Sequence, residues 1–436
     1  MSTLPRRDFL GALAWPAAAA ALPGGAWLKP GASLALADLA GDARPAAEVA
    51  RDEDFWFQVQ EAFTADRSMV NLNNGGVCPA PALVQAAMKR YLDQANEAPA
   101  YVLWRLQDPQ KETVRKGLAR LFGCDPEEIA LTRNASESLE NVQQGFDLAR
   151  GDEVLTTDQD YPRMINTWKQ RERRDGIVLR QIQLPVPCED DERILKCFEQ
   201  AFTPRTKVLH ICHVINLHGM ILPVKRLVAL ARSKGVPTIV DGAHSFAHLD
   251  FKHKDIDCDY FGTSLHKFLF APHGTGMLFV RREKVRGLWP LMAAPELLDD
   301  DIRKFEEIGT HPLANFLATA EALAFHELIG PARKEARQLY LRDFWARRLQ
   351  ATPRIHLHTS LAPGRSSGVA MVEIEGIDPT KLHEHLWNKE RIFTVAILHP
   401  QFQGLRISPT VYTRLSELER FCEAMERVVR DGLPPA

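Results

Sequence analysis

The sequence predicts an α/β protein: a mostly parallel, seven-stranded sheet covered by helices, followed by a smaller α+β domain. Three observations predict this class. The chain has 436 residues and is 45% hydrophobic, which is enough to form two cores. From about Ile129, short apolar runs alternate with amphipathic stretches, a pattern typical of a parallel sheet with helices on both faces. Beyond about residue 330 this regular alternation ends.

The residues ahead of the sheet have mainly helical patterns. Large apolar side chains recur at helical spacing between residues 51 and 64. A short strand begins at Val70 and runs into a polar turn. The predicted helices of this part are Arg51–Thr64, Pro81–Ala95 and Pro109–Phe122.

Seven predicted strands form the sheet of the large domain. They are Ile129–Thr132, Glu153–Thr157, Val178–Gln183, Lys207–Val214, Thr238–Val240, Tyr260–Phe261 and Gly276–Val280. The predicted helices between them are Glu137–Phe146, Arg163–Arg173, Asp191–Ala201 and Val224–Ser233. Sheets of this kind bind ligands beyond the carboxyl ends of their strands, so we expect the functional side chains there.

The pattern of the C-terminal third predicts a separate small domain. A long helix is predicted at Pro312–Leu328, and another at Ala332–Gln350. After them we predict the strands Val369–Ile374 and Leu405–Ile407 and the helices Thr380–Asn388 and Leu415–Val429. We therefore divide the chain into an N-terminal helical extension (residues 38–70), a large domain (residues 71–330) and a small α+β domain (residues 331–436).

Residues 1–37 are predicted to be a twin-arginine-type signal peptide. The stretch Pro5-Arg6-Arg7-Asp8-Phe9-Leu10 resembles such a signal, an alanine-rich segment follows it, and Ala35-Leu36-Ala37 offers a cleavage site. The segment is too short for a spanning helix, so we expect no stable membrane insertion. The expected location is the periplasm or exterior, or the cytoplasm if the leader is not functional. A disordered alanine-rich tail is the alternative interpretation.

Charge and cysteine usage argue against several classes of protein. The formal net charge is −2, and the sequence has no basic stripe of the kind that binds nucleic acid. The seven cysteines are scattered and form no CxxC motif, so neither a zinc site nor a disulfide framework is indicated. We expect most of them to be small core residues.

A lysine and an aspartate near the ends of two predicted strands indicate pyridoxal 5'-phosphate (PLP) chemistry. Asp241 closes the apolar run Thr238–Val240, and Lys267 lies in Ser264-Leu265-His266-Lys267, just before the strand Gly276–Val280. A PLP enzyme needs a lysine that binds the aldehyde as a Schiff base. It also needs a carboxylate that keeps the pyridine nitrogen protonated. A surface lysine and a turn aspartate are the competing interpretation.

Three motifs together resemble the class V aminotransferase family, which has PLP fold type I, and most of all its isopenicillin-N-epimerase-like members. They are Asp241-Gly242-Ala243-His244, Ser264-Leu265-His266-Lys267 and Leu405-Arg406-Ile407-Ser408. The resemblance extends from about Val70 to the C-terminus, and the motifs occur in the family's order. It implies an enzyme that uses PLP on an α-amino acid and works as a homodimer.

The resemblance places the phosphate of PLP between a strand and a helix. Ala135 and Ser136 would cradle it at the N-terminus of that helix, where backbone N–H groups attract anions. Ser264 and His266, close to the lysine, would add side-chain donors. Ser136 would also make a good N-cap, and the two roles are compatible.

Three further residues are expected around the ring. In relatives an aromatic residue or histidine stacks on the pyridine at the position of Tyr161; an ordinary Tyr-Pro turn is the alternative. His244 would bond the phenolic oxygen of the ring or lie near it, unless it is an exposed histidine at a helix start. Asn216, together with His218, occupies a strand-to-loop element that faces the site in the family.

The resemblance also assigns the substrate side and a partner. Arg406 would hold the substrate α-carboxylate through its guanidinium fork, with a structural salt bridge as the alternative. Asn73 and Asn74 would line the substrate side. Thr310, in Gly309-Thr310, would donate its hydroxyl to the phosphate of the partner subunit, which implies an obligate homodimer with a shared active site.

After substrate binding, Lys267 would act as the general base that removes or returns the α-proton, a role that burial favours by lowering its pKa. The resulting carbanion can be reprotonated to the epimer, transaminated, or lose a β-substituent. Desulfurases of the family carry a nucleophilic cysteine on a small-domain loop, and Ser360–Ala370 contains none. We therefore rank an epimerase or racemase first and a C–S β-lyase second. An aminotransferase remains possible, and a non-catalytic PLP-binding protein is least favoured.

Overall fold

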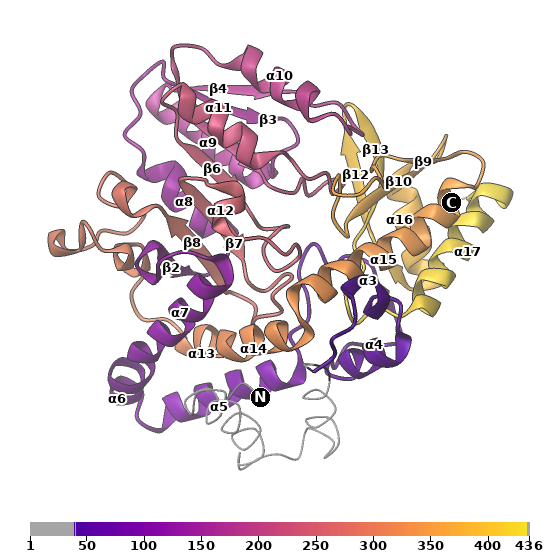
Figure 1. Cartoon of the computed structure of the whole chain (residues 1–436), viewed down its shortest axis with the longest axis horizontal. Helices are drawn as coiled ribbons and strands as arrows, with labels where there is room; N and C mark the ends of the chain where they lie inside the picture. The colour runs from indigo at the N-terminus through magenta and orange to yellow at the C-terminus, as the bar shows by residue number, and fades with distance from the viewer. Residues whose placement is uncertain (1–38, 40, 434–436) are drawn as a thin grey trace, which may run out of the picture.

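The computed structural model describes residue 39 and residues 41–433 (Figure 1). The predicted signal peptide, residues 1–37, lies outside these residues. Among the described residues, no helix is both long enough and apolar enough to cross a membrane.

A seven-stranded sheet forms the centre of the larger part, as predicted. Its strand order is β2-β8-β7-β6-β5-β3-β4, and β8 alone runs against its neighbours. The strands are β2 (Ile129–Thr132), β3 (Glu153–Thr157), β4 (Val178–Ile182), β5 (Thr206–Cys212), β6 (Thr238–Asp241), β7 (Tyr260–Ser264) and β8 (Gly276–Val280). All positions of β2, β3, β6, β7 and β8 are buried, because helices cover both faces.

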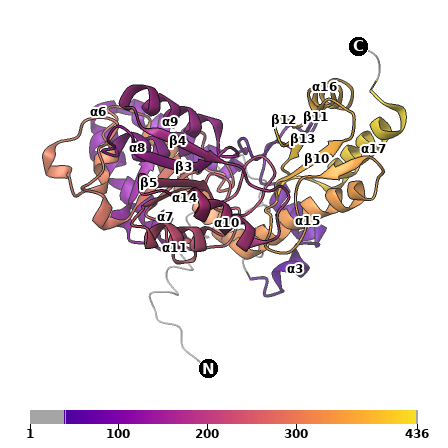
Figure 2. The ribbon, with the colours of Figure 1, turned by 90° about the horizontal axis from the view of Figure 1, so that it is seen from above.

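Side chains of the strands alternate between two cores, one on each face of the sheet. Val154 and Ile239 pack with α8 (Ala135–Gly145) and α9 (Pro162–Asp175), whereas their neighbours Leu155 and Val240 pack on the other face. The helices of that second face are α7 (Lys111–Phe122), α10 (Asp191–Ala201), α11 (Val224–Ser233) and α14 (Thr319–Ile329). Figure 2 shows the two helical layers on either side of the strands.

The smaller part is built on an antiparallel sheet of order β12-β13-β10-β9 (Figure 2). Its elements are α15 (Pro331–Gln350), β9 (Ile355–Leu357), β10 (Ala370–Ile374), α16 (Pro379–Glu390), β12 (Val395–His399), β13 (Phe402–Ile407) and α17 (Leu415–Asp431). Trp345 of α15 packs edge-on against Phe421 of α17 at the centre of this second core.

The N-terminal residues pack on the smaller part. β1 (Val70–Asn71) pairs in parallel with β11 (Ile392–Phe393). In the same region, α3 (Ala46–Val49) contacts α15, and Arg337 of α15 forms an ion pair with Glu53 of α4 (Glu53–Gln60). The predicted domain boundary between residues 70 and 71 therefore cuts β1.

The remaining elements are short or lie at the periphery. They are α5 (Ala82–Glu97), α6 (Pro99–Tyr101), η1 (Val102–Gln107), η2 (Asp108–Gln110), η3 (Pro126–Glu128), α12 (His253–Ile256), η4 (Arg282–Lys284), η5 (Glu296–Leu298), η6 (Ile302–Glu306) and α13 (Leu313–Leu317). The single helix predicted at Pro312–Leu328 is in fact α13 followed by α14, with Ala318 between them. The strands β9 and β12 were not predicted, since β9 is short and β12 is mostly half-exposed.

The packing at the start of β8 determines how closely α8 approaches the sheet. Gly276, the first residue of β8, lies directly beneath the turn that begins α8. A Cβ atom there would lie 2.7 Å from backbone atoms of Asn134, which cannot rotate away. Glycine thus lets the start of α8 approach the sheet closely.

Candidate active site

A cavity of about 480 Å³ opens at the carboxyl ends of β5, β6 and β7. It brings together all the predicted site residues except Asn73, Asn74, Thr310 and His218, the last of which is fully buried with its Nε2 3.0 Å from Oε1 of Gln159. The predicted residues that line it are Ala135, Ser136, Tyr161, Asn216, Asp241, His244, Ser264, His266, Lys267 and Arg406.

Lys267 lies on a tightly held loop that follows β7. The backbone N–H of Cys78 donates to the carbonyl of His266 over 3.0 Å, and the buried Lys334 donates to the carbonyl of Phe268. The amine of Lys267 opens on the cavity, 3.1 Å from Nε2 of His244. The surrounding protein lowers the pKa of Lys267 to about 8 through loss of solvation, against the opposing effect of Asp241. About a tenth of the amine is therefore neutral at pH 7, far more than for an exposed lysine.

Asp241 ends β6 and is almost fully buried. One carboxylate oxygen accepts the N–H of Ala243 over 2.8 Å, and the other accepts no hydrogen bond from the described residues. Burial raises the pKa of Asp241 to about 6, with the hydrogen bond from Ala243 acting in the opposite sense. A protonated pyridine nitrogen would supply the cation that this carboxylate lacks.

The start of α8 lies at the cavity, where the sequence predicts the phosphate cradle. Asn134 is the N-cap, and its Oδ1 accepts the N–H of Glu137 over 2.9 Å. Since Asn134 takes the capping role, the alternative assignment of Ser136 as the N-cap is wrong. The N–H of Ala135 already donates to Oγ of Ser264 over 2.9 Å, so these two residues form one polar end of the cavity.

His266 needs a proton before it can donate to a phosphate. Its Nδ1 lies 3.0 Å from the carbonyl oxygen of Thr275, which fixes the hydrogen on Nδ1. Burial and the nearby Lys267 lower the pKa of His266 to about 4. A bound dianion would raise that pKa by favouring the charged ring.

Arg406 is a buried cation without an acidic partner. Its guanidinium donates to the carbonyl of Asn216 over 3.2 Å and to Oδ1 of Asn73 over 2.8 Å. Among the described residues, its Nε has no hydrogen-bond partner and no carboxylate lies within ion-pair distance of its guanidinium. The structural salt bridge considered above is therefore not formed. Burial lowers the pKa of Arg406 to about 10, and a substrate carboxylate would provide the missing anion.

Asn74 and Asn73, which were predicted to line the substrate side, do not line the cavity. Asn74 is fully buried, its amide donates to the carbonyls of Asn71 and Ser408, and its Oδ1 accepts from Tyr412. It does not line the cavity, because these contacts hold the N-terminal turn against the smaller part. Asn73 acts through Arg406, as described above, and does not line the cavity either.

Thr310 lies outside the cavity, in a separate depression that Leu103 and Trp104 also line. Its predicted contact belongs to a second subunit and stays a prediction. His244, by contrast, is buried inside the cavity wall, so the alternative of an exposed histidine is wrong. Burial and Lys267 hold the pKa of His244 well below its usual range, and its Nδ1 finds no hydrogen-bond partner among residues 39 and 41–433.

Cys212, Arg163 and Met164 also line the cavity and were not predicted. Cys212 is the last residue of β5, and the strand-end rule would have selected it. Burial raises the pKa of the Cys212 thiol well above its usual range, so the thiol stays protonated. Arg163 and Met164 follow Tyr161 at the start of α9.

The cavity fits PLP by the chemistry of its unsatisfied groups. The cavity is lined by the buried carboxylate of Asp241, which lacks a close cation, and by Lys267, whose pKa is lowered. It is also lined by the N-terminus of α8, where backbone N–H groups favour an anion. Nδ1 of His244, Oδ1 of Asn216 and Nε of Arg406 are buried in its wall without hydrogen-bond partners in the described part of the chain. A ligand with both hydrogen-bond donors and acceptors would satisfy these polar groups.

Comparison with known proteins identifies the same region. The model of the family described as Aminotransferase class-V matches residues 70–421. Isopenicillin N epimerase of Streptomyces clavuligerus is 30% identical over 388 residues, which are 85% of this chain and 98% of that protein. The apo structure of the cysteine desulfurase from Thermococcus onnurineus NA1 superposes with a TM-score of 0.76, at 24% identity, over 88% of this chain and 98% of that one.

A third similar protein is the cystine C-S lyase C-DES, solved in complex with its reaction product cysteine persulfide. It has a TM-score of 0.74 and 20% identity, and the match covers 83% of this chain and 98% of that one. The likeness to these two structures establishes the fold.

The depressed pKa of Lys267 predicts the pH dependence of cofactor uptake. Only the neutral amine attacks an aldehyde, so the uptake rate of the apoprotein should rise with pH to a midpoint near 8, far below that of an exposed lysine. Asp241→Asn should move this midpoint down, because it removes the charge that opposes the shift. The measurement is the visible absorbance of PLP mixed with apoprotein across pH.

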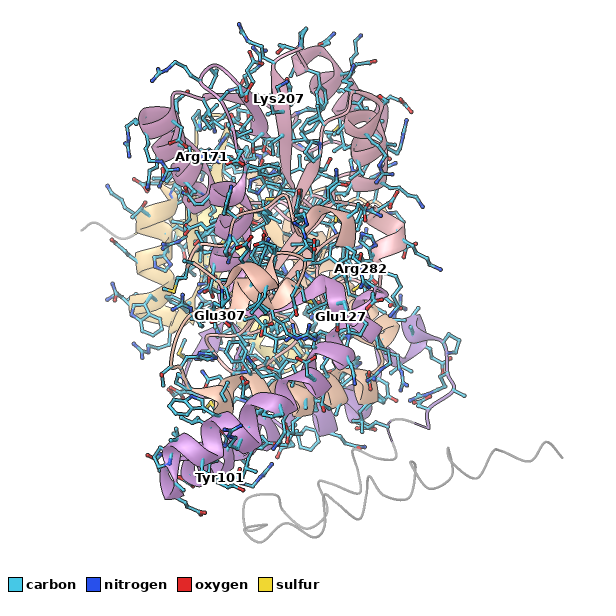
Figure 3. The ribbon with its side chains drawn as sticks, turned by 90° about the vertical axis from the view of Figure 1, so that its left-hand side faces the viewer. Tyr101, Glu127, Arg171, Lys207, Arg282 and Glu307 are labelled. Atoms are coloured by element: carbon cyan, nitrogen blue, oxygen red, sulfur yellow. The ribbon has the colours of Figure 1, made fainter. Side chains whose placement is uncertain are left out.

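Lys207→Ala, at an exposed position of β5 (Figure 3), is the matched control and should leave the profile unchanged. Lys267→Ala should abolish the absorbance of the lysine-bound cofactor. A midpoint near 10.5 would contradict the burial argument.

Proposed function

The chain belongs to the class V aminotransferase family and is a PLP-dependent enzyme, and within that family we propose that it epimerises the α-carbon of an amino acid. The sequence similarity to isopenicillin N epimerases supports this reaction. The observation that carries it is the position of two proton-bearing side chains, Lys267 and Tyr161, which come from strands on opposite sides of Asp241.

The order of the strands determines on which side of Asp241 Lys267 and Tyr161 lie. β6, which ends at Asp241, lies between β7 and β5, and β3 lies beyond β5. Lys267 follows β7, whereas Tyr161 follows β3. Both side chains line the cavity, so we place the substrate α-carbon between Lys267 on one side and Tyr161 on the other. Epimerisation requires a proton to leave one face of the α-carbon and another to reach the opposite face.

Arg406 and Lys267 would act together on the substrate. The guanidinium, held by Asn73, binds the α-carboxylate and turns the α-hydrogen toward Nζ of Lys267. Lys267 accepts that proton, and PLP supplies the electron sink that stabilises the charge left behind. The neutral His244, 3.1 Å away, holds Nζ in position.

Tyr161 would return a proton from the other side. Its side chain is 41% exposed, and its hydroxyl makes no hydrogen bond with the described residues. A hydroxyl that is free of partners can donate to the reacting carbon and recover its proton from solvent. In this role Tyr161 goes beyond the stacking contact expected from the sequence.

A C–S β-lyase is the second candidate, and its chemistry would begin with the same proton abstraction. The cavity has no thiolate that could carry a persulfide, because Cys212 is buried and protonated and the loop at residues 360–370 contains no cysteine. A lyase would therefore expel its leaving group without help from an enzyme thiol. Release of pyruvate distinguishes it from an epimerase.

We also propose that the enzyme is a homodimer in which Thr310 reaches the phosphate of the partner's cofactor. Trp104, which lines the depression that contains Thr310, is 60% exposed, and Tyr101, three residues before it and labelled in Figure 3, is 61% exposed. Large apolar side chains exposed together are typical of a surface that a second chain covers.

Isotope exchange tests the reaction. In heavy water, the wild-type enzyme should place deuterium at the α-carbon of an L-amino acid and produce the D-isomer, without pyruvate. Tyr161→Phe should keep deuterium exchange in the L-isomer but slow inversion by about 100-fold or more, the usual size of a lost acid–base group. Proton NMR and chiral chromatography measure the two rates.

Tyr340→Phe, on α15 and outside the cavity, is the control and should leave both rates unchanged. Lys267→Ala should abolish both. Pyruvate as the main product would replace the epimerase proposal with the lyase. Equal loss of exchange and inversion in Tyr161→Phe would exclude tyrosine as the second proton donor.

The role of Arg406 can be separated from cofactor binding. Arg406→Gln should raise KM for an amino acid by about 10- to 100-fold, as expected for a lost charge-assisted hydrogen bond pair. The affinity for PLP should change little, and so should the affinity for an amine that lacks the carboxylate. If the amine and the amino acid are affected equally, Arg406 does not bind the carboxylate.

Complementation tests the shared site. Lys267→Ala and Thr310→Asp should each be inactive as homodimers, the second because its carboxylate repels the phosphate. In a mixed dimer, one site combines both defects and the other has neither, so unfolding and refolding equal amounts together should restore about a quarter of the wild-type activity. No recovery, with mixed dimers verified by mass spectrometry, would show that Thr310 serves its own subunit or none.

A further inference from the structure

His248 is a buried histidine that lies next to the candidate active site but does not line its cavity. It is found in the turn that follows β6, four residues after His244. Its ring contacts the turn itself, the loop that carries Lys267, and the loop that leads into β10 of the smaller part. A single side chain thus joins the two parts of the molecule beside the site.

The hydrogen bonds of His248 fix the position of the hydrogen on its ring. The backbone N–H of Gly368 donates to Nε2 over 3.0 Å, so this nitrogen carries no hydrogen. Nδ1 therefore carries the hydrogen of the neutral ring and donates it to the carbonyl oxygen of His244 over 2.8 Å. Burial lowers the pKa of His248 to about 3, against the effect of the bond to His244, so the ring stays neutral.

Within the larger part, His248 contacts both segments that hold the amine of Lys267. His244, whose carbonyl it binds, has its own ring 3.1 Å from Nζ of Lys267. Phe268, the next residue after Lys267, stacks on the imidazole of His248 with ring centroids 3.9 Å apart. Ala247 has a left-handed backbone with a φ of 56°. Such strain persists only where surrounding contacts fix the backbone, so this turn is held in one conformation.

Within the smaller part, Gly368 brings the loop before β10 up to the ring of His248. A Cβ atom at residue 368 would lie 2.8 Å from Nε2 of His248 and 2.9 Å from Cβ of Gln338, so glycine is needed for this approach. Two residues later β10 begins, and it pairs with β13 so that Met371 lies opposite Arg406. A short backbone segment and one pair of strands therefore connect His248 to Arg406.

The residue next to Gly368 attaches the loop at a second place. The N–H of Ser367 donates to the carbonyl of Gly219 over 2.9 Å, in the turn after β5. This contact does not involve His248 and should remain when His248 is replaced. Loss of the bond to Gly368 should therefore shift the smaller part slightly rather than detach it.

We propose that His248 is a positioning residue that sets the spacing between Arg406 and Lys267. It does so by joining the loop before β10 to the two segments that hold the amine. The inference rests on the proposed function at one point, the binding of the substrate α-carboxylate by Arg406. It applies whether epimerisation or β-elimination follows, because both begin with an amino acid bound in this way.

Asparagine and glutamine each keep one of the two hydrogen bonds of His248. The amide nitrogen of asparagine can replace Nδ1, and the amide oxygen of glutamine can replace Nε2. The probes are L-norleucine and pentylamine, which differ only in the carboxylate. Each is titrated into the holoenzyme, and binding is followed by the absorbance of the cofactor. His248→Asn should weaken norleucine by about three- to tenfold, the size of a lost hydrogen bond, and leave pentylamine unchanged. His248→Gln should keep both ligands within about twofold of the wild type.

Two further measurements follow the connection itself. Hydrogen–deuterium exchange of the apoprotein, read by mass spectrometry, should be faster at the N–H of Gly368 in His248→Asn but not in His248→Gln. When Arg406→Gln is already present, adding His248→Asn should weaken norleucine by less than about a further twofold. The reason is that the guanidinium that His248 positions is gone.

His210→Asn is the matched control. His210 is also buried, its pKa is also lowered by burial, to about 4, and its Nδ1 accepts a hydrogen bond of 3.0 Å from Trp168 of α9. This variant should keep the wild-type preference for norleucine even if it unfolds at a lower temperature.

Three outcomes would overturn the proposal. Equal weakening of norleucine and pentylamine in His248→Asn, or the same loss of preference in His248→Gln, would show a role in stability alone. An unchanged preference in His248→Asn would contradict the positioning role and leave the proposed function intact. A wild-type enzyme that does not prefer norleucine to pentylamine would contradict the role of Arg406 as well.

Discussion

The constraint on which the site depends is the removal of Lys267 and Asp241 from water at the ends of adjacent strands. Burial disfavours the charged form of each, which lowers the pKa of the amine and raises that of the carboxylate. Their attraction offsets only part of this cost, because each group lacks a close partner of opposite charge. The surrounding structure must therefore hold both groups in place. For Lys267, the amine of Lys334 and the backbone N–H of Cys78 do so by donating hydrogen bonds to the carbonyls on either side of it.

Much of this arrangement could be predicted from the sequence because it follows from strand ends. The strands that carry Asp241 and Lys267 are short apolar runs, and parallel strands bring their carboxyl ends to one edge of the sheet. Ala135 and Ser264, the residues predicted to bind the phosphate, follow the same rule, since Ala135 comes shortly after β2 and Ser264 ends β7. The residue types then narrowed the chemistry to PLP, and the family model over residues 70–421 agrees. The α10 and α11 boundaries were predicted correctly because their apolar faces are strongly periodic.

The rest depended on contacts that no local pattern records. Asn74 has the residue type of a ligand-binding amide, yet its partners Ser408 and Tyr412 come from the far end of the chain. Cys212 is indistinguishable from a core cysteine until the end of β5 is known. Nothing in the sequence distinguishes Arg171 and Arg174 from the other arginines of α9, and only the structure shows that both pair with Asp175. The half-exposed β12 has no strong alternation to identify it.

The position of Arg406 on β13 affects which amino acids the enzyme can distinguish from one another. Arg406 belongs to the antiparallel sheet of the smaller part, whereas Lys267 and Asp241 belong to the seven-stranded sheet. The bond from the backbone N–H of Gly368 to Nε2 of the stacked His248 is one of the contacts that fixes the two sheets relative to each other. If Arg406 binds the substrate α-carboxylate as proposed, the spacing between the sheets sets the number of carbon atoms between the amine and the carboxylate of the substrate. In an amino acid whose amine is one carbon further from its carboxylate, the amine and the carboxylate would not reach Lys267 and Arg406 in the same alignment, even though every polar group could still find a partner.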